Sequence, residues 1–249
     1  MTASPSLPPL TFLVDYDGTI CLTQVVDELM VEFAPSDEWL RLDAMYDRGE
    51  IGSRSELAQL VAWLPAERER VVAAAAEQPH DETFIGFVTM ASSVGAEIEI
   101  VSDGYGFYVE PALARLGLTG LPIATAETSW ATGRAEIRFP FGHPDCHLCG
   151  TCKRNRVLHH RARGRHVILV GDGTSDRYAA AHADSIFAKA PLSDWCAGAG
   201  WAYRPWSTFD EVSAWLAGVV EDPSRLDPPS DRGFICGPEV WGSAQAQGS

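Results

Sequence analysis

The sequence predicts an α/β fold in which a parallel β-sheet is flanked by helices. Three short runs have the length and composition of strands: the apolar runs 10–14 and 167–170, and the run 97–101, in which two glutamates alternate with isoleucines. Each run ends in a turn of polar residues and glycine, and the segments between the runs carry apolar residues at helical spacing. Strands that alternate with helices form βαβ units, whose strands lie parallel. We therefore expect the polar turns to meet at the carboxyl edge of one sheet, where open α/β folds bind their ligands.

The first apolar run, 10–14, leads directly into Asp15-Tyr16-Asp17-Gly18-Thr19. Because Asp15 and Asp17 are two residues apart, the end of a strand can present both carboxylates on one side. There they can hold a divalent cation and aim a nucleophile at an electrophile. The same five residues are also typical of a strand that enters an ordinary Asp/Gly turn. Alone, the motif leaves a catalytic and a structural interpretation open.

A second acidic turn follows the run 167–170 and reads Gly171-Asp172-Gly173-Thr174-Ser175-Asp176. If the two strands lie side by side, their turns bring four carboxylates together. Such a group repels itself unless a cation lies between its members. Oxygen ligands and a phosphate substrate both favour Mg2+. The predicted group consists of Asp15, Asp17, Asp172 and Asp176.

Two further segments offer groups that bind anions. Ser102-Asp103-Gly104 follows the run 97–101 and presents a hydroxyl and backbone N–H groups, and Lys153 supplies a positive charge. Each is weak evidence alone, because a serine after a strand and a solvated lysine on a helix are both common. Their order along the chain favours phosphoryl transfer, which needs positioned groups and neutralised charge on the transferring oxygens.

Helical spacing dominates the segment between the first two turns. Apolar residues recur on one face over 25–33, 57–64 and 84–91, so 22–93 is expected to be helical. For any one of these apolar residues, packing is a better interpretation than contact with a ligand. An insertion at this place in the chain would lie at the mouth of the site.

The later elements are expected to be shorter. Residues 123–139 predict a hairpin with its turn at Thr132-Gly133, and residues 201–203 predict a short strand. Residues 209–219 predict a helix, because Thr208 and Glu211 form a capping-box pattern at its start.

In this order the motifs resemble those of the haloacid dehalogenase-like (HAD) hydrolase superfamily, and specifically its phosphatases of subfamily IB. The resemblance runs from about Phe12 to about Lys189. It implies a Rossmann-like core with an inserted helical cap of the C1 type. The boundaries that it implies are 10–21 and 94–220 for the core, 22–93 for the cap, and 1–9 and 221–249 for terminal extensions.

The resemblance also implies a role for each site residue. Asp15 would be the nucleophile that forms an aspartyl-phosphate. Asp17 would protonate the leaving oxygen and then activate water, which argues against dehalogenation because a halide leaves without a proton. Ser102, Asp103, Gly104 and Lys153 would bind phosphate, whereas Asp15, the backbone carbonyl of Asp17, and Asp172 would ligate Mg2+ with Asp176 in support.

The substrate is expected to be a small phosphorylated metabolite. Phosphoserine phosphatases carry a glutamate, which meets the substrate ammonium, at the position of Gln24, and a neutral Gln24 cannot supply that charge. The MtnX-like branch, which includes the enolase-phosphatase of methionine salvage, shares more with the chain, including the Gly52-Ser53-Arg54 stretch and the S-D-G-x-x-F-Y pattern at Ser102 to Tyr108. Its substrate is 2-hydroxy-3-keto-5-methylthiopentenyl 1-phosphate. Gly106 stands where many relatives have an aspartate.

A loop rich in cysteine precedes Lys153. Three cysteines at two-residue gaps, with two histidines, could supply soft ligands to a structural Zn2+ that positions Lys153, although the spacing is too tight for a standard finger. Cysteines that simply lie on a small turn are the alternative interpretation. The loop residues concerned are His143, Cys146, His147, Cys149 and Cys152.

Composition limits the partners and the location. The chain has 249 residues and is 46% hydrophobic, so it can bury a sizeable core. Its formal charge of −15 argues against nucleic acid or an anionic membrane as a partner. No apolar run reaches about 18 residues and no signal peptide is evident, which predicts a cytoplasmic protein.

Two other function classes use the same pattern. A phosphotransferase or mutase would employ the same residues but deliver the phosphoryl group to an organic acceptor. A binding protein could keep the fold without turnover, although the complete set of Asp15, Asp17, Ser102, Lys153 and Asp172 argues against that. The oligomeric state and the leaving group are left open by the sequence.

Overall fold

The computed structural model of the chain describes residues 7–233. Contacts between residues divide the chain into two compact units. The first comprises the described parts of Met1–Asp15, Asp81–Ile100 and Lys153–Phe234, and the second comprises Tyr16–His80 and Val101–Cys152. Most of the predicted extension 1–9 and the end of the predicted extension 221–249 lie outside the described residues.

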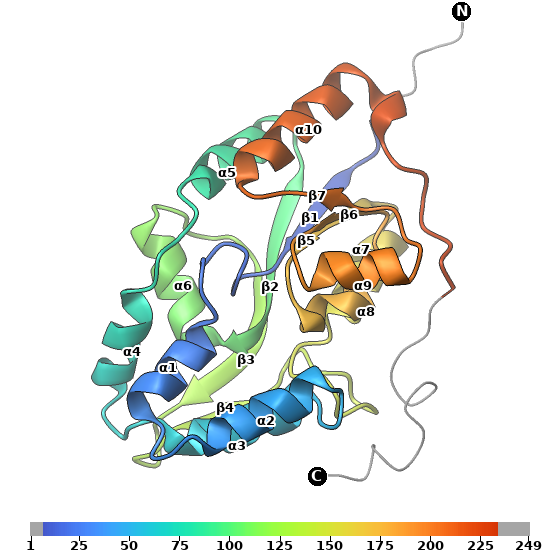
Figure 1. The fold of residues 1–249 in the computed structure, drawn as a ribbon. Coiled ribbons are helices and arrows are strands. Elements are labelled where there is room, and N and C mark those ends of the chain that lie inside the picture. The colour runs from blue at the N-terminus through green and yellow to red at the C-terminus, as the bar shows by residue number, and fades with distance from the viewer. Residues whose placement is uncertain (1–6, 234–249) are drawn as a thin grey trace, which may run out of the picture. The chain divides into compact units, whose positions relative to one another are not determined.

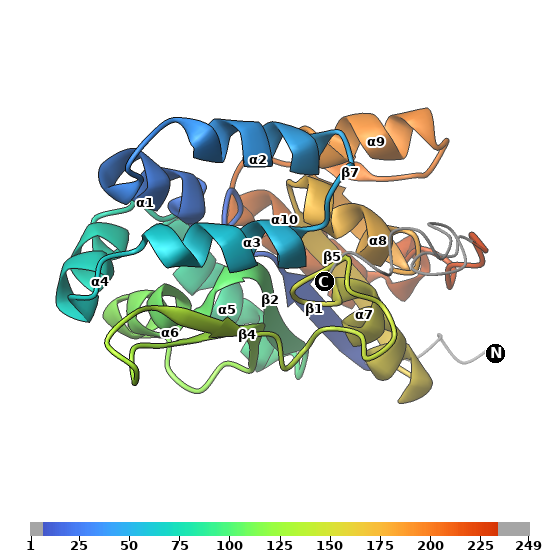
Figure 2. The same ribbon diagram turned by 90° about the horizontal axis from the view of Figure 1, so that it is seen from below.

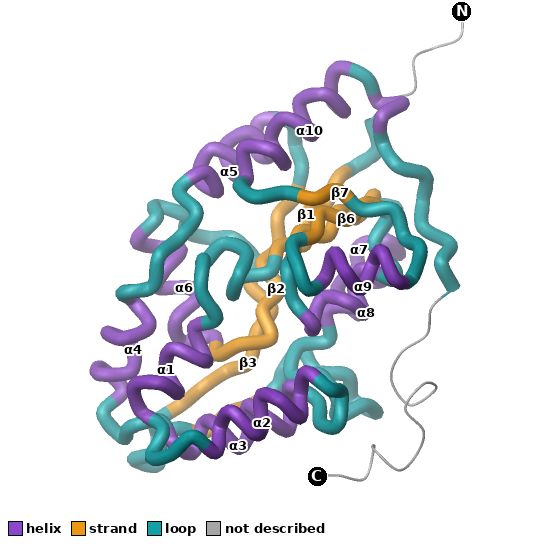
Figure 3. The backbone as a smooth tube through the Cα atoms, viewed as in Figure 1, coloured by secondary structure: helices purple, strands orange, loops and turns teal. Residues whose placement is uncertain are grey.

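The first unit is built on a parallel sheet, shown by the orange strands of Figure 3. Its central strand β1 pairs with β2 on one side and with β5 on the other, and β6 and β7 follow beyond β5. All four pairings are parallel, which confirms the predicted fold class. The strands are β1 (Leu10–Val14), β2 (Glu97–Tyr105), β5 (His166–Gly171), β6 (Ser185–Ala188) and β7 (Arg204–Pro205).

Helices cover this sheet and bury its apolar side chains. Helices α5 and α10 run side by side (Figure 1), and an aromatic cluster fills the space between them and β1. The ring centroids of Phe12 and Phe87 are 4.9 Å apart, and those of Phe84 and Phe209 are 4.7 Å apart. The helices of this unit are α5 (Thr83–Ser93), α7 (Lys153–Ala162), η2 (Thr174–Asp176), α8 (Arg177–Ala180), α9 (Leu192–Gly198), α10 (Phe209–Glu221) and η3 (Pro223–Arg225).

The second unit combines helices with a hairpin, and its helices α1 to α4 are visible in Figure 2. Strand β2 enters this unit after Ile100, and the full strand order is β4-β3-β2-β1-β5-β6-β7. Strands β3 and β4 are antiparallel, and Gly133 in their turn has φ +82°, so the predicted hairpin is confirmed. The elements are α1 (Val25–Phe33), α2 (Glu38–Asp47), α3 (Ser53–Leu60), η1 (Val61–Trp63), α4 (Arg68–Ala76), α6 (Gly106–Arg115), β3 (Ile123–Ser129) and β4 (Glu136–Arg138).

The two compact units divide the chain differently from the predicted core and cap, whose bounds stay a prediction. Helix α5, inside the predicted cap 22–93, lies in the first unit, where its phenylalanines pack on β1 and α10. Residues 101–152 of the predicted core lie in the second unit. The predicted strand 201–203 is displaced to β7, Arg204–Pro205, because those residues pair with Phe187 and Ala188 of β6. Helix α10 begins as expected, with the Glu211 carboxylate accepting the Thr208 N–H at 3.3 Å.

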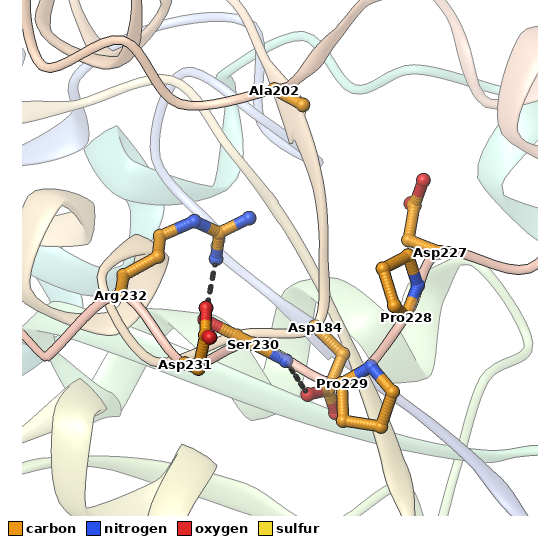
Figure 4. A pocket seen from close by; sticks show the side chains of 8 residues that line it. All are labelled: Asp184, Ala202, Asp227, Pro228, Pro229, Ser230, Asp231 and Arg232. Atoms are coloured by element: carbon orange, nitrogen blue, oxygen red, sulfur yellow. Dashed lines mark hydrogen bonds between the residues drawn. The ribbon is translucent and has the colours of Figure 1, made fainter.

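The described part of the predicted C-terminal extension is tied to the first unit. Asp227 accepts hydrogen bonds from Arg204 at 2.5 and 2.9 Å, and the Ser230 N–H donates to Asp184 at 2.9 Å. Figure 4 shows Asp184, Asp227 and Ser230 among the residues that line a small pocket of about 150 Å³. Asp184 and Asp227 both accept hydrogen bonds from neighbouring groups. We therefore interpret the pocket as a polar junction that holds the segment around residues 227–230 in place.

None of the helices in residues 7–233 combines the length and the apolar character that crossing a membrane requires.

Candidate active site

Three carboxylates meet at the carboxyl edge of the first unit's sheet. Asp15 follows β1 and its N–H donates to Val170 O of β5 at 2.9 Å, so it lies beside the turn that carries Asp172 and Asp176. Each of the three carboxyl groups offers an oxygen within 4.8 Å of the others. All three residues are buried, and Asp176 is fully buried. The predicted meeting of these turns is confirmed for this unit.

Lys153, the first residue of α7, lies among these carboxylates. Its Nζ is 2.8 Å from Asp15 Oδ2, 2.8 Å from Asp176 Oδ1 and 2.8 Å from Ser175 Oγ. The three ammonium hydrogens therefore each have an acceptor. The side chain is 1% exposed, so this lysine is a buried partner of carboxylates and not a solvated residue on a helix.

The charges of this cluster do not balance. Burial alone would lower the pKa of Lys153, but Asp15 and Asp176 outweigh it and hold that pKa above its usual value. The pKa of Asp15 is raised by burial and by the charges of Asp176 and Asp172, which Lys153 only partly offsets. Burial and the neighbouring carboxylates both act to raise the pKa of Asp15, and the carboxylates of Asp15 and Asp176 raise that of Lys153.

The backbone of the β5 turn holds Asp176 in place. Its Oδ2 accepts the N–H groups of Asp172 at 3.2 Å and Gly173 at 3.1 Å. A Cβ atom on Gly171 would overlap the Asp176 carboxylate, so this position needs glycine for space. The Gly-Asp-Gly backbone thus fixes the direction of the Asp176 side chain.

This donor set fits a divalent cation. Three buried carboxylate oxygens lie together, and a net negative charge remains after Lys153 is counted. Oxygen ligands of this kind suit Mg2+, whose charge would compensate the excess. Asp15 and Asp172 would be the direct ligands, with Asp176 in support.

A second group of predicted residues meets in the other unit, around Asp17. Asp17 Oδ1 accepts the N–H of Val25, at the start of α1, at 3.0 Å. Its Oδ2 accepts the Tyr108 hydroxyl at 2.9 Å and lies 3.4 Å from the Ser102 hydroxyl. The Ser102 oxygen accepts the Gly104 N–H at 3.1 Å. Asp17, Ser102 and Gly104 are therefore neighbours, as predicted.

Asp103 has a different environment from the one expected of a phosphate ligand. Its carboxylate accepts a short hydrogen bond from the Ser53 hydroxyl and one from the Thr151 N–H at 2.6 Å. The Gly150 N–H donates to Ser53 Oγ at 3.1 Å. The Asp103 side chain thus contacts residues 151 and 53, and through Ser53 it is linked to residue 150, shortly before Lys153 in the sequence.

The structure places the predicted residues in two groups. Asp15, Lys153, Asp172 and Asp176 belong to the first unit, and Asp17 and residues 102–104 belong to the second. Only Tyr16 separates Asp15 from Asp17, so the chain itself keeps their Cα atoms within about 7 Å. Their joint action stays a prediction.

Sequence reasoning assigned no role to three residues of these groups: Ser53, Tyr108 and Ser175. Ser53 and Tyr108 each bond a predicted site residue that is far away in the sequence. Both belong to patterns that the resemblance already contained, Gly52-Ser53-Arg54 and S-D-G-x-x-F-Y. Those patterns could have marked Ser53 and Tyr108 as candidate site residues, although a pattern does not show which residues the side chains contact.

Gln24 and Gly106, the two positions connected with the substrate, lie in the second unit. Gln24 is the N-cap residue of α1 and its carbonyl accepts the Glu28 N–H at 3.2 Å. A Cβ atom on Gly106 would lie 2.6 Å from Ala126 O and 2.6 Å from Thr125 Cγ2. Packing of α6 against β3 therefore accounts for glycine at 106 here.

The ligand atoms of the cysteine loop are not gathered around one point in this structure, so the zinc site stays a prediction. Among residues 7–233, three or more His, Cys, Asp or Glu ligand atoms gather only at Asp15, Asp172 and Asp176. The ring nitrogens of the loop have other partners: His147 Nδ1 lies 2.8 Å from Arg54 Nη1, and His143 Nδ1 accepts the Asp145 N–H at 3.0 Å. None of the five described cysteines forms a disulfide.

Glu56 on α3 is a buried carboxyl with only acidic neighbours. It is 7% exposed, and no side chain or backbone group of residues 7–233 donates to it. Burial and the charges of Asp43, Asp27 and Asp103 raise its pKa to about 8. The unfolded chain releases this proton first, so the carboxyl lowers stability as pH rises from about 4.5 to about 8.

We expect Glu56→Gln to stabilise the protein, and to do so more at pH 8 than at pH 5. The amide keeps the shape of the side chain and removes a proton that the folded state must retain. Melting temperatures of both proteins at the two pH values measure the effect. An equal difference at pH 5 and pH 8 would show that Glu56 has an ordinary pKa.

Comparison with known proteins finds relatives and a shared fold. The chain is 29% identical over 210 residues to a 2-hydroxy-3-keto-5-methylthiopentenyl-1-phosphate phosphatase of Exiguobacterium sibiricum, which covers 82% of this chain and 94% of the relative. It is 26% identical over 225 residues to a Bacillus velezensis protein of the same name, and this match covers 89% of this chain and 93% of that relative. A solved phosphoserine phosphatase, described as a phospho-aspartyl intermediate analogue, matches with a TM-score of 0.64 at 18% identity, covering 83% of this chain and 98% of that one. That likeness shows the fold, and no family model matches the chain.

Proposed function

We propose that this chain, a member of the haloacid dehalogenase-like hydrolase superfamily, is a Mg2+-dependent phosphomonoesterase that forms an aspartyl-phosphate on Asp15. The observation that carries the proposal is the buried cluster in which Lys153 contacts Asp15 and Asp176 at 2.8 Å, with Asp172 beside them. A nucleophile, a fixed ammonium and a cation site in one place suit a phosphoryl group that moves between oxygens.

Hydrolysis would proceed in two displacements. In the first, a carboxylate oxygen of Asp15 bonds to phosphorus while the ester oxygen leaves and takes a proton from Asp17. In the second, Asp17 takes a proton from water, the water oxygen bonds to phosphorus, and the Asp15 carboxylate leaves. The products are an alcohol and inorganic phosphate, and both aspartates return to their starting forms.

The other residues would hold the transferring group. Lys153 presents its ammonium beside the nucleophile, and the Ser102 hydroxyl and Gly104 N–H supply neutral hydrogen bonds. Bound at the carboxylates, Mg2+ would offset charge on the phosphoryl oxygens. Residues 150–151, which Asp103 and Ser53 hold, would fix the entry into α7 and hence Lys153.

For the substrate we propose 2-hydroxy-3-keto-5-methylthiopentenyl 1-phosphate or a close analogue. The names of the relatives at 29% and 26% identity support this substrate. Gln24 supports it as well, because a neutral amide at the start of α1 provides no counter-charge for an ammonium. Phosphoserine is therefore expected to be a poor substrate.

The test is phosphate release from a panel of monoesters that includes this compound, phosphoserine and p-nitrophenyl phosphate. We expect the highest kcat/KM for the pentenyl ester, loss of activity with EDTA and recovery with Mg2+. Preference for phosphoserine would contradict the substrate alone. Transfer to an added alcohol in place of water would identify a phosphotransferase, and failure to turn over any ester would contradict the whole proposal.

A further inference from the structure

Tyr108 is a buried side chain whose hydroxyl donates to Asp17. It lies in the first turn of α6 and is 3% exposed, and its hydroxyl oxygen is 2.9 Å from Asp17 Oδ2. The same oxygen accepts the Tyr105 N–H at 3.3 Å. Because that N–H occupies the acceptor side, the single hydroxyl hydrogen is directed to the carboxylate. The donor and acceptor roles are therefore set by the backbone.

Aromatic packing holds this hydroxyl in place. The Tyr108 ring lies against Tyr16, with centroids 5.7 Å apart, and edge-on to Phe107 at 5.3 Å. Tyr16 is itself anchored, since its hydroxyl lies 2.7 Å from His80 Nε2. A ring packed on two sides cannot swing its hydroxyl away from Asp17 without disturbing the core of this unit.

Gly104 leaves the space that this hydrogen bond needs. A Cβ atom at position 104 would overlap the Tyr108 hydroxyl and lie 2.8 Å from Asp17 Oδ2. The backbone of Gly104 is not among those with positive φ, so other residues could adopt its conformation. The glycine is thus required by close approach and not by backbone geometry.

The contacts of Asp17 show how Tyr108 contributes to the orientation of the Asp17 carboxyl group. The Val25 N–H holds one carboxyl oxygen and the Tyr108 hydroxyl holds the other, so the plane of the group is fixed at both ends. Without Tyr108, Asp17 Oδ2 would lose a hydrogen bond of 2.9 Å and keep the longer contact with the Ser102 hydroxyl at 3.4 Å.

We propose that Tyr108 is a positioning residue that aims the Asp17 carboxyl at the leaving oxygen, and that Gly104 is its necessary partner. The inference rests on the proposed function, in which Asp17 protonates that oxygen. A misaligned acid matters most for a leaving group that needs the proton. An alkyl phosphate needs it, whereas p-nitrophenolate departs readily without it.

The test compares Tyr108→Phe with wild type on an alkyl phosphate and on p-nitrophenyl phosphate. The parameter is kcat/KM, since it reports the steps through cleavage of the ester bond and excludes the later hydrolysis of the intermediate. We expect a loss of about tenfold or more for the alkyl ester and less than about threefold for p-nitrophenyl phosphate. This split separates positioning from a general loss of folded protein, which would lower both values equally.

Tyr105→Phe is the matched control. The Tyr105 hydroxyl is also buried and donates to Leu57 O at 3.0 Å, away from Asp17. This variant loses one buried hydrogen bond, as Tyr108→Phe does, but is expected to affect the two esters by the same factor. Comparable melting temperatures of the two variants would confirm the match.

Gly104→Ala provides an independent arm. It should reproduce the selective loss on the alkyl ester, because its methyl group would displace the Tyr108 hydroxyl and press on Asp17 Oδ2. Equal losses of Tyr108→Phe on both esters, with active wild type, would overturn the inference alone. Wild type that cleaves neither ester would contradict the proposed function and the inference together.

Discussion

Asp15→Asn is expected to lower kcat by at least about 10⁴-fold, because the amide cannot act as the nucleophile. Asparagine keeps the size of the side chain and can still accept a hydrogen bond from Lys153 Nζ, now 2.8 Å from Asp15 Oδ2. The loss would therefore come from chemistry and not from a vacated space. Steady-state hydrolysis of p-nitrophenyl phosphate in saturating Mg2+ measures it.

The melting temperature of Asp15→Asn serves as a control for folding. Removing one of three buried carboxylates reduces their mutual repulsion, and Lys153 keeps Asp176 and Ser175 as acceptors. In the absence of Mg2+ the melting temperature should therefore be equal to or above that of wild type. A kcat within about threefold of wild type, less than about 1 kcal/mol in the barrier, would contradict covalent catalysis by Asp15.

Lys153→Met should have the largest effect on stability. Methionine preserves much of the side-chain volume but removes the ammonium that contacts the buried Asp15 and Asp176 carboxylates. Breaking a buried ion pair from one side costs about 3–5 kcal/mol, which corresponds to a fall in melting temperature on the order of 10 °C for a chain of this length. Urea unfolding at pH 7 without Mg2+ measures the free energy.

A second substitution separates charge from packing. Lys153→Met combined with Asp176→Asn removes one negative charge from the unbalanced cluster and should recover part of the lost stability. If the loss came from packing of the methionine, the second change would recover nothing. A single Lys153→Met variant that loses less than about 1 kcal/mol would show that the lysine is not needed to balance the cluster.

The central sheet and its catalytic turns were predictable because local signals coincide there. Strands β1 and β5 are continuous apolar runs, as strands buried on both faces are, and each is followed by a glycine-containing acidic turn. Parallel pairing then forces Asp15 beside the turn of Asp172 and Asp176. The chemistry of these residues followed from their types and order.

Partners that are distant in the sequence were not predictable. Asp17 and Tyr108 are 91 residues apart in the sequence. Tyr108 lies among apolar residues of α6, where an aromatic side chain is expected to pack in the core. The helix 84–91 was expected, but its packing on α10 depends on Phe209, far along the chain. Pattern reasoning identifies a face of a helix but not the surface that covers it.

The cysteine loop shows how little spacing alone decides. Spacing of cysteine and histidine in the sequence suggested ligands for zinc, whereas the two histidine rings have other partners in this structure. His147 lies against Arg54, and His143 accepts a hydrogen bond from its own loop. Short spacing makes a ligand set possible, but the directions of the side chains decide whether it forms.

The most direct test of the double displacement uses Asp17→Asn with p-nitrophenyl phosphate. This leaving group needs no acid, so Asp15 should still be phosphorylated, but hydrolysis of the intermediate should stall without the base. We predict a rapid burst of p-nitrophenolate approaching one equivalent of enzyme, and an acid-quenched peptide that carries a phosphoryl group on Asp15. Slow linear release without a burst and without a phosphorylated peptide would contradict an aspartyl-phosphate on Asp15.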